Sequence, residues 1–225
     1  MTRSDIIPMV LFGAILVSLG INTPQAANEI IARLFDKSIA NSELQPSQQD
    51  VDRFQAILTD KSDKEIRQLL AQRALGEKIS ESVLADYAQK NNIEPNAAEI
   101  QSAYSVIKTW TLDLAEQEGY SQQEVDRYRR AMAQGMAKSW KVSKSLYEHF
   151  GGEVAFQQSN PLTPVGAYRD LFAQYQEKGD FVIYDPIFKA AFWESVKVRY
   201  AKVLDENDVD FTTPWWEYSQ TAASE

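Results

Sequence analysis

Residues 78–107 read KISESVLADYAQKNNIEPNAAEIQSAYSVI, a pattern typical of two amphipathic helices joined by a tight turn. Apolar residues recur every three or four positions on both sides of the turn, which is the spacing of a helix face. Asn91 or Asn92 can adopt the left-handed conformation that ends a helix. Asn96 and Glu99 have the spacing of a capping box at the start of the next one. We therefore expect an antiparallel helical hairpin, which needs further elements to complete a core. The core-facing residues of this hairpin are expected to be Val83, Leu84, Tyr87, Ile100 and Tyr104.

Signals of the same kind place helices along most of the chain. Each combines a capping side chain or a proline with apolar residues at helical spacing. Helix starts are expected at Asn41 or Ser42, Ser47, Ser62, Ser121, Thr163-Pro164 and Asp185-Pro186.

The ends of these helices are indicated by glycine and by changes in the apolar pattern. The helix after Ser62 is expected to kink or end at Gly76, and the helix after Asn96 to run through Trp110 to Gly119. The helix after Pro186 is expected to carry apolar residues as far as Val203. Short strands are expected at the start of residues 30–44, in residues 153–158 and in residues 180–184.

These elements predict a mostly α-helical α+β protein with two to four short strands. Residues 28–150 are expected to form a helical domain. Residues 147–218 hold 16 of the 25 aromatic residues, so residues 151–225 are expected to form an aromatic-rich α+β part that packs on the helical one. The final residues, from Asp205 onward, are acidic and aromatic and are expected to be irregular.

Composition excludes several classes of function. The chain has 225 residues, a net charge of −9 and no dense run of Lys and Arg, so it lacks the clustered cations that nucleic acid or an anionic membrane surface requires. It contains no cysteine, which excludes disulfides and a lipid anchor attached through cysteine.

The first 27 residues have the layout of a secretory signal. Arg3 precedes an apolar run from Ile6 to Ile21, and small or polar residues follow to Ala27. The run is shorter than the roughly 20 residues that span a bilayer. We expect cleavage near Ala27 and a periplasmic protein. The alternative is an uncleaved segment that anchors the protein in the inner membrane.

The N-terminal half resembles a known family over residues 29–107. Residues 30–44, IIARLFDKSIANSEL, are similar to the entry segment of the SurA-like periplasmic chaperones. The turn at Lys90, Ile93, Pro95 and Glu99 is similar to the later helical hairpin of the same N-terminal domain. The resemblance implies binding of unfolded or extended polypeptide. Such chaperones often carry a parvulin-type prolyl isomerase domain. The strand and glycine-rich loop of that domain have no counterpart here, so the resemblance gives no support for catalysis.

The sequence carries only weak signals for a catalytic or a metal site. His149 is the only histidine, and with no cysteine it cannot complete a usual zinc set. It is better explained as a cation at the end of a helix. Asp205, Asn207 and Asp208 do not fit a calcium loop, because Val209 occupies a ligand position and no glycine supplies the turn. We expect no catalytic residue, metal or cofactor.

The aromatic pairs Phe192-Trp193 and Trp215-Trp216 are the candidate peptide-binding residues. Adjacent side chains point in different directions, so one ring of each pair can lie outside the core and contact an extended polypeptide. The alternative is that all four rings pack a small domain. Met132 and Met136 share one helix stripe and are expected in the core.

The sequence thus predicts a periplasmic, chaperone-like protein that binds polypeptide without catalysis. Two alternatives stay open: an exported enzyme that acts on cell-wall glycan through carboxylates, and a membrane-anchored assembly factor.

Overall fold

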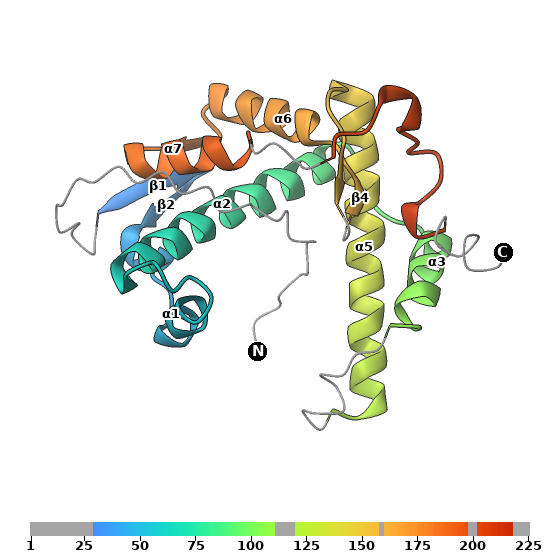
Figure 1. Ribbon diagram of the computed structural model, residues 1–225. Coiled ribbons are helices and arrows are strands. Elements are labelled where there is room, and N and C mark those ends of the chain that lie inside the picture. Colours follow the sequence, from blue (N-terminus) through green and yellow to red (C-terminus); the bar gives the residue numbers. More distant parts are fainter. Residues whose placement is uncertain (1–28, 111–119, 158–159, 198–201, 218–225) are drawn as a thin grey trace. The chain divides into compact units, whose positions relative to one another are not determined.

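The structure, a computed structural model, describes residues 29–110, 120–157, 160–197 and 202–217 (Figure 1). The chain is mostly helical with a few short strands, which confirms the predicted fold class. The helices are α1 (Gln48–Gln55), α2 (Asp63–Lys90), α3 (Ala97–Ile107), α5 (Gln122–Phe150), α6 (Val165–Glu177) and α7 (Pro186–Ser195). The strands are β1 (Ile30–Leu34), β2 (Lys37–Ala40), β3 (Ala155–Gln157), β4 (Asn160–Thr163) and β5 (Phe181–Ile183).

The chain divides into two compact units, each made from segments distant in sequence. Residues 29–85 and 168–197 form the first, here called the sheet unit. Residues 86–167 and 202–217 belong to the second, here called the α5 unit. Both units therefore contain residues from each side of position 150, whereas the sequence predicts a division at that position.

The sheet unit is organised around a three-stranded antiparallel sheet in the order β2-β1-β5. Strand β5 lies nearly 150 residues after β1 in the sequence, and Arg33 helps to hold the two ends together. Its guanidinium donates hydrogen bonds to the carbonyl oxygens of Phe35, at 2.8 Å, and Gly179, at 3.0 Å. One side chain thus links the β1–β2 turn to the turn that precedes β5.

The core of the sheet unit combines aliphatic residues of β1 and α2 with aromatic rings of α6, β5 and α7. The ring of Phe192 packs edge-on against both Phe172 and Phe181, with centroids 5.6 Å apart in each case. Ile31 and Phe181 on the paired strands are completely buried. Val83 and Leu84 on α2 are buried as predicted, and Ile66, Leu75 and Ile79 of the same helix are buried with them.

The α5 unit is built on the long helix α5, against which α3 packs. Ala103 on α3 and Ala133 and Ala137 on α5 are completely buried, and such small side chains let helix surfaces approach closely. The helix partner of α3 is therefore α5, where the sequence predicts an antiparallel hairpin with the helix before the turn. The β3–β4 hairpin follows α5.

Two glycines bring the start of α6 against the chain that leaves α5. Gly152 has a positive φ of 86°, and a Cβ on Gly166 would lie only 2.7 Å from the backbone nitrogen of Glu153. The Gly166 N–H donates to the Glu153 carbonyl at 3.0 Å. Only glycine allows this contact, because any side chain at position 166 would displace the backbone.

Several predicted boundaries need correction. Helix α2 continues through Gly76, because a buried glycine inside a long amphipathic helix costs less than the loss of the following turns. Helix α3 ends at Ile107, before Trp110, and the predicted stop at Gly119 lies outside the described residues. Helix α7 ends at Ser195, and Val203 instead pairs with Ala155 in a β-bridge. The helix expected after Asn41 is a single 3-10 turn.

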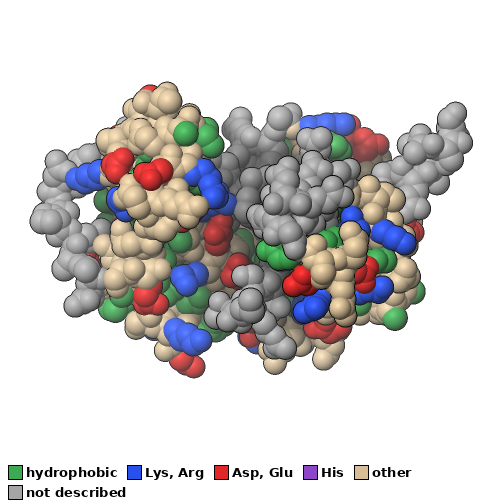
Figure 2. Space-filling model, turned by 90° about the horizontal axis from the view of Figure 1, so that it is seen from below, with side chains coloured by type: hydrophobic (Ala, Val, Ile, Leu, Met, Phe, Trp, Pro, Cys, Tyr) green, Lys and Arg blue, Asp and Glu red, His purple; other side chains and the backbone are tan. Residues whose placement is uncertain are grey.

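None of the helices in the described part of the chain has both the length and the apolar character needed to cross a membrane. The described surface in Figure 2 shows Lys, Arg, Asp and Glu side chains interspersed with hydrophobic ones. This mixed pattern agrees with the scattered charges of the sequence.

Candidate functional site

The aromatic pair Phe192-Trp193 lies on α7 in the sheet unit. Phe192 is 3 % exposed and belongs to the core, whereas Trp193 is only partly buried. The two rings meet edge-to-face at 5.3 Å, and the Trp193 indole N–H donates to the Gln176 side-chain oxygen at 2.9 Å. The Trp193 ring is thus fixed on one edge by a hydrogen bond and keeps part of its surface exposed.

The pair Trp215-Trp216 lies in the α5 unit and has the same arrangement. Trp216 is completely buried and Trp215 partly buried, with the rings edge-to-face at 5.5 Å. Each predicted pair therefore places one ring in a core and leaves its neighbour partly exposed. Of the four predicted peptide-binding residues, Trp193 and Trp215 retain surface that could contact a polypeptide, and Phe192 and Trp216 support them from below.

Trp216 belongs to Leu204–Glu217, here called the C-terminal segment, which lies beside α3 and α5 (Figure 1, red). Its described structure is irregular apart from a 3-10 turn at Glu206–Asp208 and a helical stretch at residues 215–217. Side chains join it to the helices. Phe211 lies against Tyr147 of α5 with ring centroids 5.1 Å apart, and Trp216 meets Trp140 edge-on at 5.8 Å.

Hydrogen bonds between side chains join the end of the C-terminal segment to α3. The Trp216 indole N–H donates to the Ser102 hydroxyl oxygen at 3.1 Å, and that hydroxyl donates to a Glu217 carboxylate oxygen at 2.6 Å. The Ser102 hydroxyl thus forms hydrogen bonds with two residues of the segment at once. A buried indole N–H normally requires such an acceptor, so this contact fixes the register of the segment on α3.

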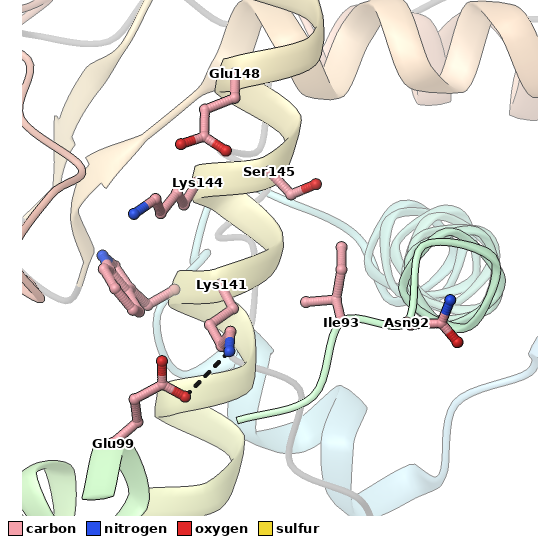
Figure 3. Close-up of a pocket in the computed structure, with 8 residues that line it drawn as sticks. Asn92, Ile93, Glu99, Lys141, Lys144, Ser145 and Glu148 are labelled. Atoms are coloured by element: carbon pink, nitrogen blue, oxygen red, sulfur yellow. Dashed lines mark hydrogen bonds and ion pairs between the residues drawn. The ribbon is translucent and has the colours of Figure 1, made fainter. Parts of the chain in front are cut away.

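A hollow of about 300 Å³ lies in the α5 unit, between the turn after α2, the start of α3 and the C-terminal part of α5 (Figure 3). Its volume is at the lower end of the range found for small-molecule sites. The residues that line it are Asn92, Ile93, Glu99, Trp140, Lys141, Lys144, Ser145 and Glu148.

The charged groups of this hollow are balanced. Lys141 and Glu99 point toward one another and form an ion pair at 3.2 Å (Figure 3, dashed line). The Lys144 ammonium lies 5.5 Å from the centre of the Trp140 ring, within the range of a cation–π interaction. Ser145 shares a hydrogen bond of 3.0 Å with the Tyr87 hydroxyl. Equal numbers of cations and anions beside an aromatic ring suit a polar or zwitterionic group, such as part of a polypeptide.

A second polar cluster in the α5 unit joins α3 to α5. The buried Tyr104 donates a hydrogen bond to Asp126, which also accepts one from Arg130 at 2.9 Å. The Arg130 guanidinium lies 4.5 Å from the centre of the Tyr104 ring. The bonds from Tyr104 and Arg130 hold the pKa of Asp126 below its usual value, and the bond to Asp126 raises the pKa of Tyr104. The cluster is explained by its own mutual contacts and stabilises the α3–α5 packing.

The other residues considered in the sequence occupy ordinary positions. His149 is exposed in the last turn of α5, where a cation is favourable. Asp205 precedes a 3-10 turn that ends at Asp208, and the Asp208 N–H donates to the Asp205 carbonyl at 2.8 Å. Within the described ranges, no group of three or more His, Cys, Asp and Glu residues could hold a metal ion.

Two features of this unit are missed by sequence reasoning. The hollow forms from residues 92–99 and 140–148, which only the packing of α3 on α5 brings together. The docking of the C-terminal segment is hidden because an irregular stretch carries no periodic pattern. Its one signal is the combination of Phe211, Trp215 and Trp216 in an acidic region, where large apolar side chains need a partner surface.

Comparison of the chain with protein-family models, with curated proteins and with solved structures found no match.

Proposed function

We propose that the protein binds extended polypeptide in a chaperone-like manner, without catalysis, and that it acts in the periplasm. The observation that supports this most is the seating of the C-terminal segment on α3 and α5. An irregular stretch of chain is held there through aromatic side chains, and such contacts are the kind that an unfolded polypeptide offers.

The partly exposed rings of Trp193 and Trp215 add to this proposal. Each is supported by a buried neighbouring ring, so it presents apolar surface without collapsing into the core. A rigid, partly exposed aromatic ring contacts a partner at a small cost in side-chain entropy. Trp193 and Trp215 are therefore the proposed contact residues for polypeptide.

The resemblance of residues 29–107 to SurA-like chaperones and the signal-like first 27 residues support the periplasmic setting. If the first segment is not cleaved, the same activity would belong to a protein anchored in the inner membrane. A periplasmic protein has no ATP supply, and the sequence carries no phosphate-binding glycine loop. The proposed activity is therefore independent of ATP.

The test is light scattering from an unfolded outer-membrane-type client that aggregates on dilution. The wild-type protein at several-fold molar excess is expected to suppress scattering without ATP. The double variant Trp193→Ala, Trp215→Ala is expected to suppress it less, because the proposed contact rings are lost. Trp216 is left in place, because it is completely buried and is not a proposed contact residue.

The matched control is the double variant Phe156→Ala, Tyr184→Ala. These aromatic residues are 45 % and 53 % exposed and lie outside the proposed contacts. This variant is expected to protect the client as well as the wild type does. Aggregation unchanged by the wild type would refute the proposed function. If both variants protect the client as well as the wild type does, the polypeptide binds to another surface.

A further inference from the structure

The surface of α3 and α5 that the C-terminal segment covers combines small buried residues with large aromatic ones. Ala103, Ala133 and Ala137 are completely buried in the same core cluster as Phe211 and Trp216, while Trp140 and Tyr147 of α5 contact the aromatic rings of the segment. Well-packed pockets that receive a large aromatic side chain are the usual centres of binding energy in protein interfaces. The surface thus has the construction of a peptide-binding site.

The C-terminal segment occupies this surface in the manner of a bound peptide. Its two buried rings, Phe211 and Trp216, are five positions apart, and both are at most 6 % exposed. Residues between them, such as Thr212 and Pro214, are exposed or only partly buried. Another chain could present the same pattern, which is two aromatic anchors five positions apart. The indole N–H of the second anchor would then donate to the Ser102 hydroxyl of α3.

The charge of the C-terminal segment is complementary to that of α5. Every charged residue of the segment is acidic: Asp205, Glu206, Asp208, Asp210 and Glu217. Helix α5 carries six cations, Arg127, Arg129, Arg130, Lys138, Lys141 and Lys144, against three carboxylates, Glu124, Asp126 and Glu148. Arg130, Lys138 and Lys141 form ion pairs with Asp126, Glu94 and Glu99, so the complementarity to the segment is one of net charge. Opposite charges favour the association of an acidic segment with this helix and disfavour a basic one.

We propose that the α3–α5 surface recognises acidic segments with two aromatic anchors five positions apart, and that Leu204–Glu217 is its resident occupant. This specificity rests on the proposed polypeptide binding and names the class of segment that is bound. A tethered occupant is present at an effective concentration of the order of millimolar. An external segment therefore competes with it, and release of the occupant opens the site.

The test uses the full chain and a fluorescent peptide with the sequence of residues 204–217, LDENDVDFTTPWWE, followed by fluorescence anisotropy. The released variant is Phe211→Ala, Trp216→Ala, in which the internal anchors are removed. It is expected to bind the peptide at least about tenfold more tightly than the wild type, because the tethered competitor no longer holds the site. A peptide with alanine at both anchor positions is expected not to bind.

The graded control is Glu217→Ala, which removes only the bond from Ser102 and leaves both rings in place. One hydrogen bond to a charged group corresponds to roughly a tenfold effect, so this variant should lie between the wild type and the released variant. Circular dichroism establishes folding, and Glu217→Ala decides the result if the released variant is unfolded. A peptide with amides in place of its carboxylates tests the role of charge. If it binds as tightly as the original peptide, the site does not recognise acidic residues.

The client assay separates this inference from the proposed function. Tighter peptide binding together with stronger client protection by the released variant would support both. Equal peptide binding by the wild type, Glu217→Ala and the released variant would overturn the recognition site, even if all three protect the client. Tighter peptide binding with unchanged protection would show that clients bind elsewhere and would overturn the proposed client class. A wild-type dimer that disappears in the released variant would overturn occupancy by the chain's own segment in favour of exchange with a second copy.

Discussion

Asp126 takes part in both a hydrogen bond between two helices and an ion pair within α5. It accepts hydrogen bonds from Tyr104 on the neighbouring helix and from Arg130 one turn along its own. The first of these bonds is the larger cause of its lowered pKa. A carboxyl group whose pKa is lower in the folded than in the unfolded state stabilises the fold at neutral pH. That contribution is lost when the pH falls through the folded pKa.

We expect Asp126→Asn to lower the free energy of unfolding at pH 6 and to have a smaller effect near pH 2. The unfolded pKa of aspartate is about 3.9, so the difference between wild type and variant is complete above that value and shrinks below it. Urea unfolding at a series of pH values measures it. Asp208→Asn, in an exposed 3-10 turn, is the matched control. A difference that stays constant from pH 6 to pH 2 would contradict the prediction.

Leu84 tests the core of the sheet unit. It is 6 % exposed on α2, and Leu84→Ala is expected to cost roughly 2–5 kcal/mol, because buried surface is lost and a cavity remains. Ile57→Ala is the control, since Ile57 is 72 % exposed and a surface change of this kind stays within about 0.5 kcal/mol. Chemical denaturation measures both, and equal effects would show that Leu84 is not a core residue.

Helix starts are the elements that the sequence predicts best. Ser47, Ser62, Asn96, Ser121 and Asp185 all accept a backbone hydrogen bond at the start of a helix, as their sequence context indicates. A cap and its acceptors lie within three residues, so local sequence contains the whole interaction. Helix ends and short strands depend on what packs there, which explains the errors at Gly76 and Val203 and the omission of β2 and β4.

Asn96 provides the test at this scale. Its side chain accepts from the Glu99 backbone N–H at 2.9 Å, and Glu99 accepts from the Asn96 backbone in return. Asn96→Ala is expected to lower the free energy of unfolding by about 1 kcal/mol, whereas Asn96→Ser keeps a capping oxygen and should lower it by less. Thermal or urea unfolding distinguishes them. Equal losses for the two variants would mean that the cap does not stabilise α3.

The pairing of helices lies beyond what the sequence indicates. The stripe that ends at Ile107 predicts that α3 has a buried face: Tyr104 and Ile107 are buried, and the predicted Ile100 is partly buried. A stripe does not identify the element that covers it, and the expected partner was the helix before the turn. The observed partner, α5, begins after residue 120. The candidate hollow depends on this pairing, so it could not be predicted from local patterns.

At the scale of the whole molecule, the residue types of the candidate site can be predicted from the sequence, whereas their places in the fold cannot. The aromatic pairs and the acidic C-terminal end are visible in the sequence. Which ring of each pair is buried follows from packing alone, because adjacent residues offer either ring to the core. The peptide-binding roles of Trp193 and Trp215 stay a prediction until the client assay is done.

Export is the first prediction for the whole molecule. The apolar run from Ile6 to Ile21 and its flanks lead us to expect cleavage near Ala27 when the protein is made in a Gram-negative cell. Intact-mass measurement of protein released from the periplasm gives the mature N-terminus directly. A chain that begins at Met1 and fractionates with the inner membrane would establish the anchored alternative.

Prolyl isomerase activity is expected to be absent, because the sequence contains no segment similar to a parvulin domain. Uncatalysed isomerisation of a proline peptide takes tens of seconds or longer, so even weak catalysis would be visible in a standard peptide assay. Saturable acceleration by the purified protein, proportional to its concentration, would contradict this prediction. Heat-denatured protein serves as the blank.

The edge-on contact between Trp140 and Trp216 gives the molecule an intrinsic optical signal. Two indoles with centroids 5.8 Å apart and planes inclined by 75° are close enough for their electronic transitions to couple. Coupled transitions produce a paired positive and negative band in the circular dichroism spectrum, which single tryptophans do not show. One indole belongs to α5 and the other to the C-terminal segment, so the contribution of this pair is lost when the segment leaves its site, whereas Trp215 and Trp216 both lie on the segment and their coupling does not depend on α5. The occupancy of the site can therefore be followed spectroscopically in the unlabelled wild-type protein.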